Sequence, residues 1–158
     1  MFDLVIIAAV LAFLNGCGTA GEPETVDMRT VLRANKPSTD LYIHPDFVDT
    51  VNQFAEDCPN ADFSQIHSIR YAAIQDAQHQ FRIGTCYFGD SIQILDTLES
   101  APYDPIIMRA LLYHELGHCV LGLEHSDTGM MEPYLDVEAP AYYDTHWNEL
   151  VTGMCGSK

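Results

Sequence analysis

Basic residues are scarce in this chain, which has 7 Lys and Arg residues against 23 Asp and Glu residues and a formal net charge of −16. Proteins that bind nucleic acid or an anionic membrane surface need clustered positive charge, because phosphates repel an acidic surface. The sequence contains no basic cluster. We therefore exclude nucleic acid as a partner.

Long apolar runs are also missing, and the run at residues 4–14 is too short to span a bilayer as a helix. Its length is typical of a signal peptide, although Asp3 stands where a basic residue is usual. The letters LNGC, which end at Cys17, resemble a bacterial lipobox. We predict a lipoprotein-type signal peptide at 1–16 and a membrane tether through a lipidated Cys17. A soluble signal peptide or a buried N-terminus is the alternative.

No two cysteines form a CxxC pair, which argues against a zinc site made of cysteines. Besides Cys17 the chain has Cys58, Cys86, Cys119 and Cys155. An even number in an exported chain favours disulfides, with three possible pairings. We expect Cys58–Cys86 and Cys119–Cys155, because each pair then joins neighbouring elements. The predicted location is periplasmic or at the outer membrane as a lipoprotein, with secretion as the alternative; in a cytosolic protein the four would be free buried thiols.

The 158 residues suffice for one domain, and their patterning indicates an α/β (α+β) fold. A tether and irregular lead-in rich in Gly, Pro and polar residues is expected at 17–40, and the domain at 41–158. Alternating or clustered β-formers predict strands at 41–44, 66–74, 79–89 and 90–96. Apolar residues at helical spacing predict helices at 46–57, 106–121 and about 142–153.

The helix expected at 106–121 carries His114, Glu115 and His118. Histidines four residues apart share one helix face, with their Cβ atoms about 5–6 Å apart. Both imidazoles can then reach one Zn²⁺ at about 2.0–2.1 Å. Glu115 points to the side, where a carboxylate can take a proton from a water molecule and hand it to a leaving amine. The alternative is a structural pair of histidines.

A catalytic zinc site needs a further protein ligand and one open position. Gly122 ends the helix, so that Glu124 or His125 can turn back toward the metal. The stretch HELGHCVLGLEHSDTGMMEPY resembles the matrixin group of the metzincin metallopeptidases, whose signature is HExxHxxGxxH followed by a methionine-containing turn. The first five letters match the first half of the signature. Gly122 and His125 match the second half, and Met131 matches the turn.

One departure from that signature affects the third ligand. Residues 119–121 separate His118 from Gly122, where the family has two residues, so strict counting selects Glu124. We favour His125, because the glycine makes the turn and its spacing to the ligand is retained. The extra residue can be absorbed by a wider last helical turn or a π-type bulge. A neutral imidazole also suits zinc.

The resemblance implies a metzincin-like fold, similar to the collagenase catalytic domain. This fold has a twisted, mixed and mostly parallel sheet, a zinc-binding helix and a C-terminal helix. Met131 would lie beneath the metal, with Met130 as its alternative. In the family an edge strand before the zinc helix binds extended peptide by strand addition. The strand at 90–96 is our candidate.

For the substrate pocket we expect Ile92 and Ile94 from that strand, together with Tyr134. Tyr142 and Tyr143 could also line the pocket or donate to the oxyanion, and ordinary packing is an equal alternative for all three tyrosines.

The sequence thus predicts a zinc-dependent endopeptidase in which His114, His118 and His125 bind one Zn²⁺ and Glu115 is the catalytic base. A structural Ca²⁺ would be compatible with the family, but no residue pattern indicates one. The expected partner is a protein or peptide substrate, and we expect a monomer. The alternatives are a catalytically inactive zinc-binding exported module and a metal-free lipoprotein scaffold.

Overall fold

A four-stranded sheet forms one side of the computed structural model, which describes residues 41–74 and 82–156. The predicted signal peptide, Cys17 and the tether lie outside the described residues. The strands are β1 (Tyr42–Ile43), β2 (Ser68–Ala72), β3 (Gly84–Tyr87) and β4 (Ser91–Leu95), in the spatial order β1-β2-β4-β3. β1 and β4 lie parallel to β2, whereas β3 is antiparallel to β4.

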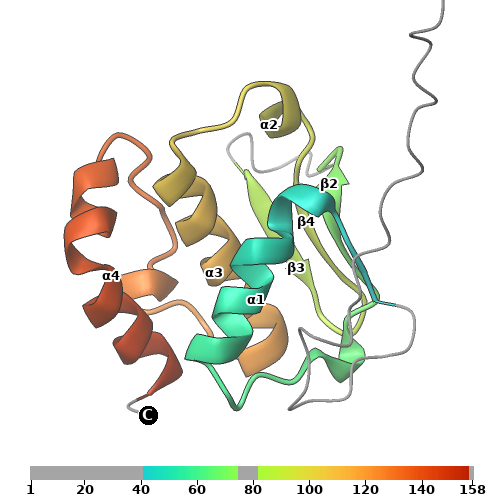
Figure 1. Cartoon of the computed structure of the whole chain (residues 1–158), viewed down its shortest axis with the longest axis horizontal. Coiled ribbons are helices and arrows are strands. Elements are labelled where there is room, and N and C mark those ends of the chain that lie inside the picture. Colours follow the sequence, from blue (N-terminus) through green and yellow to red (C-terminus); the bar gives the residue numbers. More distant parts are fainter. Residues whose placement is uncertain (1–40, 75–81, 157–158) are drawn as a thin grey trace, which may run out of the picture.

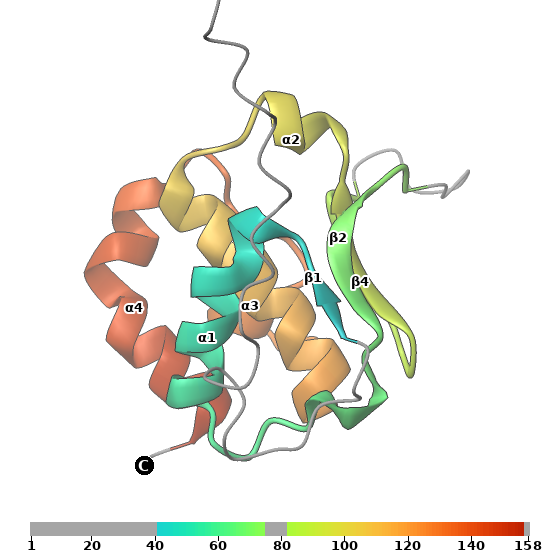
Figure 2. The same ribbon diagram turned by 45° about the vertical axis from the view of Figure 1, so that its right-hand side comes forward.

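The helices pack on one face of the sheet. They are α1 (Val48–Asp57), the short α2 (Thr97–Ser100), α3 (Pro105–Leu121) and α4 (Pro140–Cys155), with 3₁₀ turns η1 (Pro45–Phe47), η2 (Phe63–Gln65) and η3 (Gly129–Met131). α1 and α3 lie between the sheet and α4 (Figures 1 and 2). None of the helices in the described part of the chain is both long enough and apolar enough to cross a membrane.

The core lies between the sheet and α3. Ile69, Ile92 and Ile94 point from neighbouring strands toward the helices and are at most 1% exposed. On the other side the core is completed by large apolar side chains: Val51, Phe54, Phe63, Ile66, Ile107, Leu111, Leu112, Tyr113 and Leu116. Because α3 is surrounded by α1, α4 and the sheet, it is apolar on nearly every side.

The structure confirms a mixed α/β fold with a mixed sheet, and every predicted helix and strand is present. α4 begins at Pro140, slightly before the predicted start, and the short α2 was not expected. Proline is favoured in the first turn of a helix, because the N–H that it lacks has no partner there. α4 can therefore begin at Pro140.

Two disulfides are present, Cys58–Cys155 and Cys86–Cys119, with Cα–Cα distances of 4.9 and 5.5 Å. The predicted pairs Cys58–Cys86 and Cys119–Cys155 are therefore wrong. The ends of α1 and α4 meet although 97 residues separate them, and β3 lies on α3. Proximity along the chain was a poor guide, because packing of the helices on the sheet decides which cysteines meet.

Candidate metal centre

Helix α3 positions the first two histidines. It begins at the Asp104 cap, whose carboxylate accepts a hydrogen bond from the Ile106 amide at 3.0 Å, and continues with Pro105. His114 and His118 lie one turn apart, and their Nε2 atoms are 3.1 Å apart. His114 is buried and His118 is partly buried.

Gly122 ends α3 in the left-handed conformation, with φ +68°. The Gly122 amide donates to the carbonyl of Gly117, and the Leu123 amide donates to the same carbonyl at 3.0 Å. Donors and acceptor are five and six residues apart, whereas an α-helix uses a spacing of four. The last turn is therefore wider than a regular α-helical turn, which is one of the two arrangements that the sequence allowed between His118 and Gly122.

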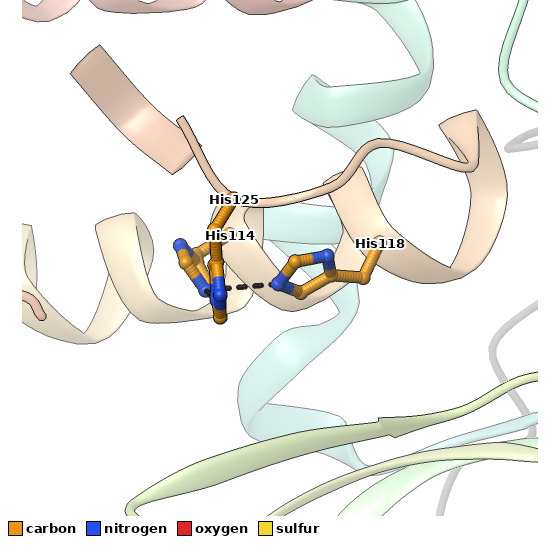
Figure 3. Close-up of side chains that lie close together, drawn as sticks. All are labelled: His114, His118 and His125. Atoms are coloured by element: carbon orange, nitrogen blue, oxygen red, sulfur yellow. Dashed lines mark hydrogen bonds between the residues drawn. The ribbon is translucent and has the colours of Figure 1, made fainter. Parts of the chain in front are cut away.

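The third histidine comes from the segment after Gly122. His125 Nε2 lies 3.3 Å from His114 Nε2, and the rings of His114, His118 and His125 point toward one another (Figure 3). The ligand atoms of the three residues all lie within 4.8 Å of one another. Glu124 is exposed and does not belong to this cluster. The spacing from Gly122 thus identified the residue that converges on the helix.

Backbone carbonyls fix the orientation of the two helical histidines. His114 Nδ1 donates to the carbonyl of Met130 at 2.9 Å, and His118 Nδ1 donates to the carbonyl of Leu123. A neutral ring that carries its proton on Nδ1 has a lone pair on Nε2. When both rings are neutral, the two Nε2 atoms cannot hydrogen-bond to each other, and a cation between them would resolve their close approach.

The spacing of the nitrogen atoms fits a tetrahedral metal. Zinc–nitrogen bonds of about 2.0–2.1 Å at tetrahedral angles place neighbouring nitrogens about 3.3–3.4 Å apart. The observed Nε2 separations from His114 are 3.1 Å to His118 and 3.3 Å to His125. All three pairs lie within 4.8 Å, so the three imidazoles could hold a metal ion and leave a fourth position for another ligand.

Burial favours the neutral form of two of the three histidines, His114 and His125. Burial above all, with smaller contributions from the neighbouring His118 and His125, lowers the pKa of His114 to about 4, against the opposing effect of the Met130 carbonyl. Desolvation by adjacent atoms, followed by the charges of His118 and Arg82, also lowers the pKa of His125. Both rings are thus available as metal ligands at neutral pH.

Glu115 lies beside the cluster and is not part of it. Burial raises the pKa of Glu115 to about 7, although the charge of Arg82 and a hydrogen bond from the backbone of Cys86 both lower it. The carboxylate packs against Gly84, where an added Cβ would lie 2.6 Å from Glu115 Oε1. A carboxylate with a pKa near 7 can accept and release a proton at physiological pH.

The two methionines that follow His125, Met130 and Met131, both contact α3. Met131 packs against Gly117, in the turn that joins His114 to His118, and an added Cβ there would lie 2.5 Å from Met131 Sδ. Met130 supplies the carbonyl that holds His114. Its side chain is buried in the core. The hydrogen bond from the Ser126 amide to the Met131 carbonyl, 2.9 Å long, closes the turn that directly follows His125.

The predicted substrate strand must be corrected. Residues 91–95 form β4, which pairs with β2 on one side and β3 on the other, so it offers no free edge. Within the described residues β3 pairs with β4 alone. Ile92 and Ile94 are 0% and 1% exposed and face the core, so they line no pocket. The β3–β4 hairpin inserts its second strand next to β2, and chain order could not reveal this.

The structure places Tyr134, Tyr142 and Tyr143 in different surroundings. Tyr134 is 86% exposed, and Tyr142 stacks on His146 at the surface. Tyr143 is buried, and its hydroxyl accepts a hydrogen bond from the Asp136 amide, so it has a packing role. Among the described residues none of the three hydrogen-bonds to the histidine cluster or makes a ring contact with it. The pocket role of Tyr134 remains a prediction.

Sequence reasoning missed several residues around the centre. The carbonyls of Leu123 and Met130 orient the histidines, yet any residue type supplies a carbonyl. Gly84 admits the Glu115 side chain, and a glycine inside an expected strand is a signal of close approach. The chain matches no family model, no curated protein and no solved structure. The geometry of the centre therefore carries the functional argument.

Proposed function

We propose that this protein is a zinc-dependent endopeptidase. The observation that carries the proposal is the convergence of His114, His118 and His125 at metal-binding distances, with the buried Glu115 next to the first of them in the helix. Three imidazoles are a ligand set that suits zinc and leaves one position for chemistry. A purely structural zinc site is usually closed by four protein ligands and has no need of such a carboxylate.

The roles of the residues follow from their surroundings. Bound to the three histidines, Zn²⁺ would supply Lewis acidity, which polarises a carbonyl and makes water acidic near neutral pH. Glu115 accepts the proton of the attacking water and returns it to the leaving amine. Its burial suits both transfers, because a desolvated carboxylate takes up a proton more readily than a solvated one.

The substrate class is a protein or peptide in an extended conformation. β3 is the edge strand nearest to Glu115, and among the described residues its outer side pairs with no strand. Such an edge can bind a peptide by adding it as a further strand. We assign the peptide to β3, in place of the strand expected from the sequence.

An exported location is part of the same proposal. Two disulfides are typical of proteins that fold in an oxidising compartment. Together with the lipobox-like letters before Cys17, they favour a periplasmic or outer-membrane lipoprotein, with secretion as the alternative.

The test compares cleavage of casein or a peptide library by the wild type and by Glu115→Gln, with Glu124→Gln as the matched control. We expect Glu115→Gln to lower kcat by about 10²–10⁴-fold, the usual contribution of a general base. Zinc content, measured by elemental analysis, should stay at one per chain in all three proteins. Equal cleavage by wild type and Glu115→Gln would reject the enzyme, and wild type without zinc would reject the metal centre.

A further inference from the structure

The disulfide Cys86–Cys119 lies at the candidate centre. Cys119 follows His118 directly in α3, and Cys86 lies in β3, where its backbone hydrogen-bonds to the carboxylate of Glu115. The two Cα atoms are 5.5 Å apart. One covalent bond therefore joins the strand that touches the predicted base to the helix that carries two predicted ligands.

β3 is an edge strand that packs on α3. It is four residues long and pairs with β4 on one side. A short edge strand of this kind opens more easily than a strand paired on both sides. On its inner face Gly84 contacts Glu115, so a shift of β3 would change the space and the hydrogen bond that hold the carboxylate.

We propose that the Cys86–Cys119 disulfide is a positioning device, which keeps β3 seated on α3 so that Glu115 is held in its working place. This inference rests on the proposed peptidase function. The metal ligands depend on it less, because His114 and His118 are oriented by the carbonyls of Met130 and Leu123, neither of which lies in β3. Opening the bond should therefore impair the chemical step more than metal binding.

The second disulfide is a natural control. Cys58–Cys155 joins the end of α1 to the end of α4, and neither cysteine lies in β3 or α3. It spans 97 residues of sequence, whereas Cys86–Cys119 spans 33. Loop-closure entropy grows with the length that is closed, so loss of Cys58–Cys155 should destabilise the fold more. If activity followed stability alone, the control would be the more damaged protein.

The experiment compares zinc-loaded C86S/C119S and C58S/C155S with the wild type in steady-state peptide cleavage. We expect kcat of C86S/C119S to fall about 10- to 100-fold, because small misplacements of a catalytic group have effects of this size. Zinc stoichiometry should be unchanged, and C58S/C155S should keep kcat within about 3-fold at temperatures where it is folded. A loss confined to KM, or an equal loss of kcat in both variants, would overturn the proposal.

Hydrogen exchange of the amides of residues 84–87 provides a readout that does not need hydrolysis. We expect exchange at least 10-fold faster in zinc-loaded C86S/C119S and nearly unchanged in C58S/C155S. Should wild type fail to cleave peptides, the peptidase function falls, while this exchange still decides whether the disulfide seats β3. Unchanged exchange in C86S/C119S would reject the proposal that the disulfide holds β3 on α3. C86A/C119A, which puts no hydroxyl into the partly buried site, replaces the serine variant if that variant does not fold.

Discussion

The candidate metal centre has two parts that are held in place by different means, and His114, His118 and His125 are its candidate ligands. The ligands on α3 sit in a regular helix that is covered by the sheet, α1 and α4. The third ligand sits in an exposed segment that depends on a left-handed glycine and a few specific hydrogen bonds. Exposure rises along the chain, from the buried His114 through His118 to the exposed His125. Two ligands are thus pre-organised by the core, and the third is supplied by local turn chemistry.

Removing a ligand from each part should give the largest effects. We expect His125→Ala to lower zinc affinity on the order of 10³-fold, about 4 kcal/mol, more than the loss of an outer-shell partner. Its metal-free stability should change little, because His125 is exposed. His114→Ala should lower both quantities, since it also leaves the buried Met130 carbonyl without its donor. Competition titration with a zinc indicator and urea unfolding measure the two quantities.

Glu124→Ala is the control for His125→Ala and His114→Ala. Its side chain is next to His125 in sequence and exposed, so zinc affinity should match the wild type. A large loss of affinity in Glu124→Ala, with little loss in His125→Ala, would transfer the third ligand to the carboxylate.

The buried carboxylate of the helical part should leave a signature in stability against pH. Raising the pKa of Glu115 from 4.5 to about 7 means that the folded, metal-free protein holds a proton that the unfolded chain releases in this range. Stability therefore falls as pH rises from 4.5 to 7, by about 3 kcal/mol. Glu115→Gln should be more stable than wild type by up to this amount at pH 8.

At pH 4 the wild-type Glu115 side chain is protonated and neutral, as is the glutamine of Glu115→Gln. The difference in free energy of unfolding between the two proteins should therefore vanish. His114 acts in the opposite sense: its pKa is lowered from 6.5 to about 4, so stability falls as pH drops through that range. Urea unfolding in the presence of a chelator at pH 4 and pH 8 tests both. A constant difference at the two pH values would contradict a raised pKa of Glu115.

Gly84→Ala tests the contact between the edge strand and the helical part. The added Cβ would lie 2.6 Å from Glu115 Oε1 and 2.9 Å from Leu111 Cδ1, so the carboxylate must move. We expect kcat to fall about 10²-fold, with zinc content unchanged. Gly153→Ala is the matched control, because its Cβ meets nothing within 4 Å in α4 and should be neutral or stabilising. Peptide cleavage with full kcat by Gly84→Ala would show that Glu115 tolerates displacement.

Gly122→Ala tests the glycine on which the exposed part depends, and its expected effect is the smallest. A side chain at φ +68° costs about 1–2 kcal/mol, although nothing lies within 4 Å of the added Cβ. Thermal unfolding should show this loss, and zinc affinity should fall by less than in His125→Ala. A variant as stable as wild type would mean that the turn does not need the left-handed conformation.

The sequence predicted the helical part well because its signals are local. A capped run of apolar residues encodes α3, and the four-residue spacing encodes the pairing of His114 with His118. Gly122 marked the turn, so even the wider last turn and His125 could be anticipated. The disulfide pairing and the edge strand could not, since both depend on how β3, β4, α1 and α4 pack together. The carbonyl contacts to His114 and His118 could not be predicted either, because every residue type has a backbone carbonyl.

The surface segment that carries His125 and continues to the Ser126–Met131 hydrogen bond would affect how fast the candidate centre exchanges a metal ion. A cation bound by two buried imidazoles and one on a surface segment would be released when that segment opens, which requires less free energy than global unfolding. We therefore expect the opening rate of residues 123–131 to set the residence time of a bound cation. A mutation that makes residues 123–131 more rigid should slow the removal of the metal by a chelator. The same mutation should leave the melting temperature unchanged.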